Sequence, residues 1–245
     1  MILEVDGGNS ALKWRVIDSR GGILGRGRSL LSDNNMLNRL AQQFPQVQLV
    51  RLSCVASEDV RQSLAQRIFD LWALEGRFAE TKKSFAGLTV VYDDAGRLGV
   101  DRWLAMLAAF HETAGPVCVF DCGSAITVDL VVEKGVHKGG YIIPGIKMQR
   151  DALLENTELI RIEKALESHN FGWGCSTEEA VNFGISRMVA GFIDSIVDEL
   201  LLSGPLPALF LTGGDAALLM PLLKHAVLFE LRSELVLDGL QVAFE

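Results

Sequence analysis

The chain has 245 residues, of which 49% are hydrophobic and 22% are charged, a composition that fits a packed globular protein and excludes a disordered, collagen-like or low-complexity one. Its length allows one large domain or two modest ones, either of which can bury a sizeable core. The net charge of −8 is opposite in sign to the basic footprint that binding to a phosphate backbone requires, so we expect no nucleic acid partner.

The N-terminal residues, MILEVDGG, lack the basic and apolar regions of an export signal. Further along, no stretch approaches the roughly 18 uninterrupted apolar residues of a membrane span. Cys54, Cys118, Cys122 and Cys175 contain no CxxC pair, which favours free thiols over a disulfide or a metal site. We therefore expect a cytoplasmic protein without a membrane partner.

The first half of the chain alternates strands and helices, as the spacing of its apolar residues indicates. The predicted strands are residues 2–5, 12–17 and 50–55, and the predicted helices are residues 36–44, 60–74 and 102–113. The first two strands form a hairpin around a glycine-rich turn that begins at Asp6. Gly115 and Pro116 provide the stop signal for the third helix.

The second half begins in the same way. An apolar run at 117–120 ends at Asp121, and residues 126–132 resume as a strand. Because Asp6 and Asp121 lie close to half the chain apart, we expect an α/β fold of two similar lobes, 1–115 and 116–245, with both polar turns facing a cleft.

A long helix is predicted at about 178–202. Ser176 and Glu179 are in capping-box register at its start, and Gly204 is its stop signal. A last strand at 209–212 leads through a third glycine turn into another helix.

The turn at Asp6 has the ingredients of a phosphate cradle, with glycine amides, hydrogen-bonding side chains and a positive charge. These residues are Asp6, Gly7, Gly8, Asn9, Ser10 and Lys13. A carboxylate is out of place beside bare phosphate unless it holds a hydrated Mg²⁺. The turn at Asp121 repeats carboxylate, glycine and hydroxyl in order, with Gly123, Ser124, Thr127 and Asp129. Either turn is also compatible with an ordinary hairpin.

Gly99, Val100, Asp101 and Arg102 precede the third helix, where a carboxylate could act as a general base and a guanidinium could clamp an anion. The alternative is a helix-capping Asp with a solvated Arg. Residues 139–145, GGYIIPG, suit close approach of the backbone to a ligand or a tight sheet connection. The sequence contains no GxSxG, GxxxxGK[ST] or HExxH motif, which removes the expected markers of α/β-hydrolases, P-loop NTPases and zinc hydrolases.

Together these motifs resemble the type III pantothenate kinases, in the superfamily of acetate and sugar kinases, heat-shock chaperone ATPases and actin. The family's DxGNTxxK loop matches Asp6 to Lys13, with Ser10 in place of Thr, and its DxGTAxTxD motif matches Asp121 to Asp129, with Ser124 in place of Thr. Its GxDR motif matches Gly99 to Arg102, GGxIxPG matches Gly139 to Gly145, and TxxA matches Thr177 and Ala180. The matches cover most of the chain in order, and both serines keep the hydroxyl.

The resemblance implies two ribonuclease-H-like lobes and the ATP-dependent phosphorylation of pantothenate to 4′-phosphopantothenate, the first step of coenzyme A synthesis. Asp101 would accept the proton of the attacking hydroxyl. The substrate would be held by Tyr92, Gly99, Val100, Asp101, Arg102 and Thr177. ATP would be held by Asp6, Gly7, Gly8, Asn9, Ser10, Lys13, Gly123 and Ser124.

The resemblance also implies Mg²⁺ near Asp6, a monovalent cation (K⁺ or NH₄⁺) at Asp121, and a homodimer in which the 178–202 helix is the candidate packing surface. Two alternatives stay open: a non-catalytic accessory factor of the same family, or another phosphotransferase of the superfamily. The acidic charge and the intact Asp101 argue against the first. Substrate competition would decide the second.

Overall fold

The computed structural model describes residues 1–8, 11–30, 33, 35–157 and 172–245 of an α/β protein. These residues form two compact units, one made of Met1–Glu112 with Leu235–Glu245 and the other of Thr113–Glu234. The boundary near residue 112 lies close to the expected one, but the last residues, expected in the second lobe, belong to the first unit. The reason is that the last helix, α7 (Leu235–Ala243), packs on the first sheet.

The first unit is built on a five-stranded sheet in the order β3-β2-β1-β4-β5. Its strands are β1 (Ile2–Gly7), β2 (Ala11–Ile17), β3 (Ile23–Leu30), β4 (Leu49–Cys54) and β5 (Gly76–Phe78). The first three strands form an antiparallel meander, and β4 and β5 run parallel to β1. The remaining elements are α1 (Met36–Gln43), α2 (Glu58–Trp72), β6 (Ser84–Phe85), β7 (Leu88–Thr89), η1 (Ala95–Arg97) and α3 (Val100–Thr113).

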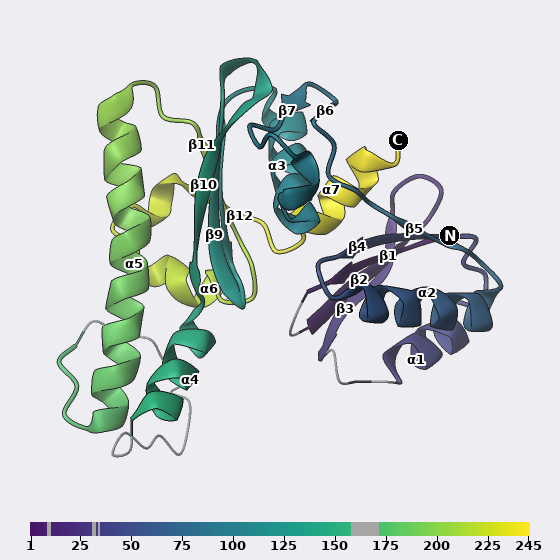
Figure 1. The fold of residues 1–245 in the computed structure, drawn as a ribbon, viewed down its shortest axis with the longest axis horizontal. Helices are drawn as coiled ribbons and strands as arrows, with labels where there is room; N and C mark the ends of the chain where they lie inside the picture. The colour runs from purple at the N-terminus through teal and green to yellow at the C-terminus, as the bar shows by residue number, and fades with distance from the viewer. Residues whose placement is uncertain (9–10, 31–32, 34, 158–171) are drawn as a thin grey trace. The chain divides into compact units, whose positions relative to one another are not determined.

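The central strand β1 is covered on both faces. Leu3 and Val5 point into an apolar cluster with α1 and α2, which lie side by side in Figure 1. Since side chains alternate along a strand, Glu4 points to the opposite face, where α7 packs. This alternation places an acidic residue in a fully buried position.

The second unit repeats the arrangement. Its strands are β8 (Val117–Cys122), β9 (Ala125–Val132), β10 (Val136–Pro144), β11 (Ala208–Thr212) and β12 (Phe229–Leu231). Their order is β10-β9-β8-β11-β12, with an antiparallel meander followed by two parallel strands. The other elements are η2 (Glu133–Gly135), α4 (Ile146–Asn156), α5 (Thr177–Ser203), α6 (Ala216–Leu219), η3 (Met220–Leu222) and η4 (Ala226–Leu228). Both units therefore have the ribonuclease-H-like strand order, which confirms the expected α/β fold of two similar lobes.

Helix α5 begins and ends where the sequence predicts. Ser176 Oγ accepts a hydrogen bond from the Glu179 amide at 3.1 Å, and the Glu179 carboxylate accepts one from the Cys175 amide at 2.7 Å. The reciprocal bond of the capping box thus reaches one residue further back than expected. Gly204 follows with a φ of 141° and ends the helix.

The same helix is long and apolar enough to cross a membrane by length and composition alone. Its buried residues nevertheless recur every three or four positions and form one face within the core of the second unit. They include Val181, Ile185, Val189, Ile193 and Val197. Figure 1 shows α5 running along the second sheet, and this pattern is typical of the core helix of a globular unit.

Candidate functional site

The first polar turn sits at the end of the central strand. Asp6 is the next-to-last residue of β1 and is paired in register with Lys13 on β2 and with Ser53 on β4. The Gly8 amide donates to the Ala11 carbonyl at 3.1 Å and closes the turn. A Cβ on Gly7 would lie 3.3 Å from the Ser53 carbonyl oxygen, so a side chain there would be tight. Asn9 and Ser10, both expected to bind ATP, lie outside the described residues.

The Asp6 carboxyl has an unusual electrostatic environment. Burial raises its pKa from 3.8 to about 6, although the residue keeps partial exposure. The Lys13 ammonium lowers this pKa, the Asp101 carboxylate raises it, and the Ser53 hydroxyl lowers it. The dependence on Asp101 shows that two carboxylates, far apart in sequence, act on one another within the first unit. The Lys13 ammonium has a larger effect on Asp6 than the Asp101 carboxylate has, so the raised pKa comes mainly from burial.

Asp101 lies in the first turn of α3, which begins at Val100 and not at Arg102 as predicted. The Trp103 amide donates to the Gly99 carbonyl at 3.1 Å, so the helical bonding starts at that glycine. Asp101 is therefore inside the helix instead of capping it. Its Oδ1 accepts a hydrogen bond from the Arg102 amide at 2.8 Å. A Cβ on Gly99 would stand 2.6 Å from the same oxygen, so a side chain at that position would force the Asp101 carboxylate to turn away.

Arg102 is only 7% exposed, so it is not the solvated arginine of the alternative interpretation. Its Nη1 donates to the Tyr92 hydroxyl at 3.3 Å, and Lys83 Nζ donates to the Tyr92 carbonyl at 2.7 Å. The predicted substrate residues Tyr92, Asp101 and Arg102 are thus brought together. A cavity of about 470 Å³ opens beside them, and Gly99 and Val100 are among the residues that line it.

The second polar turn follows the first strand of its unit, as the first polar turn does. Asp121 is the next-to-last residue of β8 and is paired in register with Thr127 on β9 and Thr212 on β11. The Gly123 amide donates to the Ala125 carbonyl at 3.1 Å. The expected Ser124 lies in this turn, and its carbonyl accepts a hydrogen bond from the Gly145 amide at 3.0 Å.

Two glycines from elsewhere in the second unit lie against this turn. A Cβ on Gly145 would stand 2.2 Å from the Gly123 carbonyl oxygen, and one on Gly213 would stand 2.3 Å from the Cys122 carbonyl oxygen. Gly145 is the last glycine of the GGYIIPG segment, and this glycine allows close packing within the unit. Real side chains cannot approach backbone so closely, and only glycine fits either position.

Asp215 is a site candidate that the motifs do not single out. Its amide donates to the Cys122 carbonyl at 2.9 Å. Burial raises the pKa of the Cys122 thiol, and the carboxylates of Asp121 and Asp215 raise it further. Two carboxylates therefore share one neighbourhood, with oxygen donors that suit a cation. The sequence feature that could have identified Asp215 is the predicted strand at 209–212 followed directly by Gly-Gly-Asp.

Ser53 and Thr212 were also missed, because each faces its aspartate across a parallel strand pair whose register the sequence does not reveal. Thr177, expected to touch the substrate, is the exposed first residue of α5 and belongs to the second unit.

Comparisons with known proteins place the chain among the members of one family. A family model described as type III pantothenate kinase matches residues 2–199. A type III pantothenate kinase from Pseudomonas aeruginosa is 38% identical over 249 residues, covering 99% of this chain and 98% of its own.

Solved structures show the same fold at low identity. A Campylobacter jejuni protein described as a candidate Baf family transcriptional activator has a TM-score of 0.58 at 20% identity, covering 99% of this chain and 96% of its own. The activator of 2-hydroxyisocaproyl-CoA dehydratase from Clostridium difficile, solved with ADPNP, has a TM-score of 0.54 at 9% identity, covering 99% and 94%. At these identities the structures bear on the fold alone.

Proposed function

Because the chain belongs to the type III pantothenate kinase family and phosphorylates pantothenate with ATP for coenzyme A synthesis, we propose that Asp101 is the general base of that reaction. The observation that supports this proposal is that the Asp101 carboxylate raises the pKa of Asp6, so the two aspartates are close enough to interact. A base must lie within reach of both the acceptor hydroxyl and the phosphate that receives it.

In the proposed mechanism the Asp101 carboxylate accepts the proton of the primary hydroxyl of pantothenate. The hydroxyl oxygen forms a bond to the γ-phosphorus as the bond from that phosphorus to the β-bridging oxygen breaks, and ADP leaves. The bond from the Arg102 amide to Asp101 Oδ1 holds the carboxylate in a fixed orientation. Most of the catalytic effect then comes from positioning and charge neutralisation.

Pantothenate is held by the residues of the predicted substrate set. In the first unit, Arg102 and Tyr92 hydrogen-bond to one another and so present a fixed donor and hydroxyl to pantothenate. Gly99 and Val100 contribute from the adjoining cavity wall. We also assign Thr177, the first residue of α5, to pantothenate binding.

ATP phosphates are held by the loop from Asp6 to Lys13, with Asn9 and Ser10, and by Gly123 and Ser124 of the second turn. Glycine amides and the Lys13 ammonium supply the donors. Asp6 suits the Mg²⁺ that travels with ATP, since a carboxylate can hold the hydrated ion that accompanies the phosphates. That ion supplies positive charge against the phosphate oxygens when bound.

Asp121 holds the monovalent cation, K⁺ or NH₄⁺, with Asp215 beside it. Their joint effect on the Cys122 thiol supports this assignment. The first unit then carries the ATP loop and the substrate motif, and the second carries the other phosphate motif and a dimer helix. For the homodimer we assign α5, whose exposed face includes Met188 and Leu202, 57% and 90% exposed. We assign the enzyme to the cytoplasm, without nucleic acid or membrane partners.

The test is a kinase assay with ATP, Mg²⁺, K⁺ and pantothenate on Asp101→Asn. Asparagine keeps the acceptor for the Arg102 amide but is not a base, so kcat should fall by at least about 10² while the KM for ATP stays within about twofold. Glu75→Gln, on the exposed loop after α2, is the matched control and should leave kcat unchanged. Near-normal turnover in Asp101→Asn would remove it from this role.

A further inference from the structure

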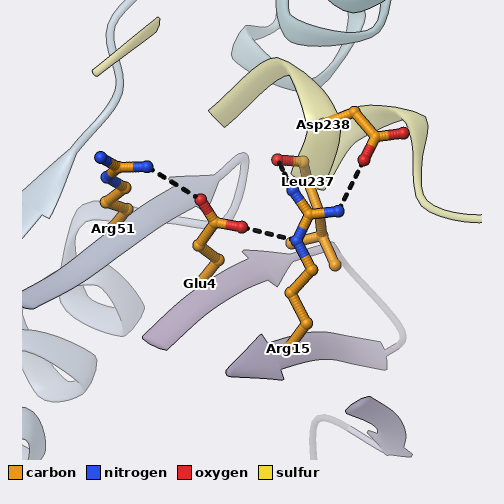
Figure 2. A network of polar contacts seen from close by, with 5 residues as sticks. All are labelled: Glu4, Arg15, Arg51, Leu237 and Asp238. Atoms are coloured by element: carbon orange, nitrogen blue, oxygen red, sulfur yellow. Dashed lines mark hydrogen bonds and ion pairs between the residues drawn. The ribbon is translucent and has the colours of Figure 1, made fainter. Parts of the chain in front are cut away.

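A buried ionic network that the mechanism does not use lies on the α7 side of the first sheet. Figure 2 shows Glu4 between two arginines: Arg15 Nε donates to Glu4 Oε2 at 2.6 Å, and Arg51 Nη1 donates to Glu4 Oε1 at 3.2 Å. Glu4 is fully buried, and both arginines are at most 8% exposed. Charges this deeply buried persist only when they are paired and hydrogen-bonded.

The same network holds the last helix. Arg15 Nη1 donates to Asp238 Oδ1 at 2.6 Å and its Nη2 donates to the Leu237 carbonyl at 2.7 Å. The Arg51 guanidinium lies over the ring of Phe244, just beyond α7, at 5.8 Å from the ring centroid. Because a guanidinium is a rigid planar fork, donors shared between β1 and α7 fix the helix in direction as well as in distance.

Helix α7 in turn touches α3 through its backbone. A Cβ on Gly239 would stand 2.2 Å from the Leu104 carbonyl oxygen and 2.6 Å from the Leu104 carbonyl carbon. With no side chain between them, a shift of α7 acts directly on the α3 backbone, since packed interiors are nearly incompressible. Leu104 follows directly on the turn that carries Asp101 and Arg102.

From this chain of contacts we infer that α7, locked by Arg15, sets the position of the Asp101 carboxylate, and that Asp238 and Gly239 are positioning residues for phosphoryl transfer. The inference rests on the role proposed above for Asp101. Its physical basis is that a displacement of about 1 Å at a reacting group lowers the rate by up to about 10².

The first test is Gly239→Ala in the full-length enzyme. The added methyl group meets the Leu104 backbone and forces α3 to move, so kcat should fall at least about tenfold while the KM for ATP stays within about twofold. Leu240→Ala is the matched control on the same helix. It removes buried packing and lowers the Tm, but it adds no atom against Leu104 and should keep kcat within about twofold.

A double-mutant cycle separates positioning from general destabilisation. In an Asp101→Asn background Gly239→Ala should cause no further loss of kcat, because the group that it displaces has already lost its function. Equal fractional losses in both backgrounds would overturn the inference. So would a loss of kcat in Leu240→Ala as large as that in Gly239→Ala. Near-normal turnover of the Asp101→Asn single variant would instead refute the proposed role of Asp101 as general base. That result would be known before the double variant is made, so the two failures can be distinguished.

Asp238→Asn decides the question if Gly239→Ala does not fold. It keeps the side-chain volume and one acceptor oxygen at a position that is 30% exposed, but it removes the charge facing Arg15. A fall of kcat of about threefold, absent in the Asp101→Asn background, supports the inference. An unchanged kcat overturns it.

Discussion

Asp6 and Asp121 occupy the same position in two units whose five main strands follow the same order. Each is the next-to-last residue of the first strand, and each faces a hydroxyl residue across the parallel pair, Ser53 in one unit and Thr212 in the other. The partners across the antiparallel pair differ, Lys13 for Asp6 and Thr127 for Asp121. The two aspartates therefore share a strand position but differ in the charge beside them, which fits the division of roles proposed for them between nucleotide phosphates and a cation.

The raised pKa of Asp6 predicts a pH-dependent stability. Between pH 3.8 and about 6 the folded state binds more protons at Asp6 than the unfolded state does, so the free energy of unfolding falls as the pH rises. Above about pH 6 the ionised Asp6 carboxylate lowers the free energy of unfolding by a constant amount. This destabilisation is on the order of 2 kcal/mol after allowing for the partial exposure of the residue. Asp6→Asn removes it, so the ligand-free variant should unfold at a higher Tm than the wild type at pH 7.5.

At pH 4 the Tm difference between wild type and Asp6→Asn should largely disappear, because the wild-type carboxyl is then protonated. Asp70→Asn, at an exposed position of α2, is the control and should leave the pH profile unchanged. The same slope of Tm against pH in wild type and Asp6→Asn would contradict the assignment.

The Asp121 site predicts cation-dependent activity. Replacing K⁺ by Na⁺ should slow the wild-type enzyme several-fold, and Asp121→Asn should show the same low rate in both salts, because the carboxylate that holds the ion is gone. Initial rates at fixed ionic strength measure this ratio. Glu133→Gln, exposed in the same unit, should keep the wild-type ratio. A variant at Asp121 that still responds to K⁺ would place the cation elsewhere.

Local signals predict the strands around each turn and the ends of α5, because an apolar run stopped by Asp-Gly and a capping Ser depend on near neighbours. Strand β3 was missed because Gly25 and Gly27 weaken its β-propensity. These two glycines make room for aromatic rings that pack against the strand. A Cβ on Gly27 would stand 2.8 Å from the Trp14 ring, and one on Gly25 would stand 2.7 Å from the Phe44 ring.

The place of α7 could not be predicted for a related reason. Its docking depends on Arg15 reaching Asp238 across most of the chain, a pairing that no local pattern reveals. For the site, the motifs identified Asp6, Asp101 and Asp121, but not Asp215, whose role depends on the pairing of β11 with β8. The pairing and register of strands far apart in the chain therefore cannot be predicted from local sequence patterns.

Gly213→Ala tests the packing of the second turn. Gly213 has a φ of +99°, and its Cβ would stand 2.3 Å from the Cys122 carbonyl oxygen. The substitution should therefore lower the free energy of unfolding by at least about 2 kcal/mol, measured by urea denaturation. Gly115→Ala is the control in the same unit, since its Cβ would meet its nearest atom, the Thr113 carbonyl oxygen, at 3.7 Å. It should change stability by less than about 1 kcal/mol. Equal losses in the two variants would contradict the steric argument.

The Arg102 and Tyr92 pair predicts a separation of substrate constants. Arg102→Lys keeps the charge but loses the planar fork that reaches the Tyr92 hydroxyl, so the KM for pantothenate should rise about tenfold while the KM for ATP stays within about twofold. Tyr92→Phe should raise the KM for pantothenate by a smaller factor, about threefold, because it removes only the hydroxyl. Arg77→Lys, at an exposed position on β5, should change neither constant. Steady-state kinetics with each substrate varied at saturation of the other measures both values, and equal rises in the two KM values would show that Arg102 supports the site as a whole instead of holding pantothenate.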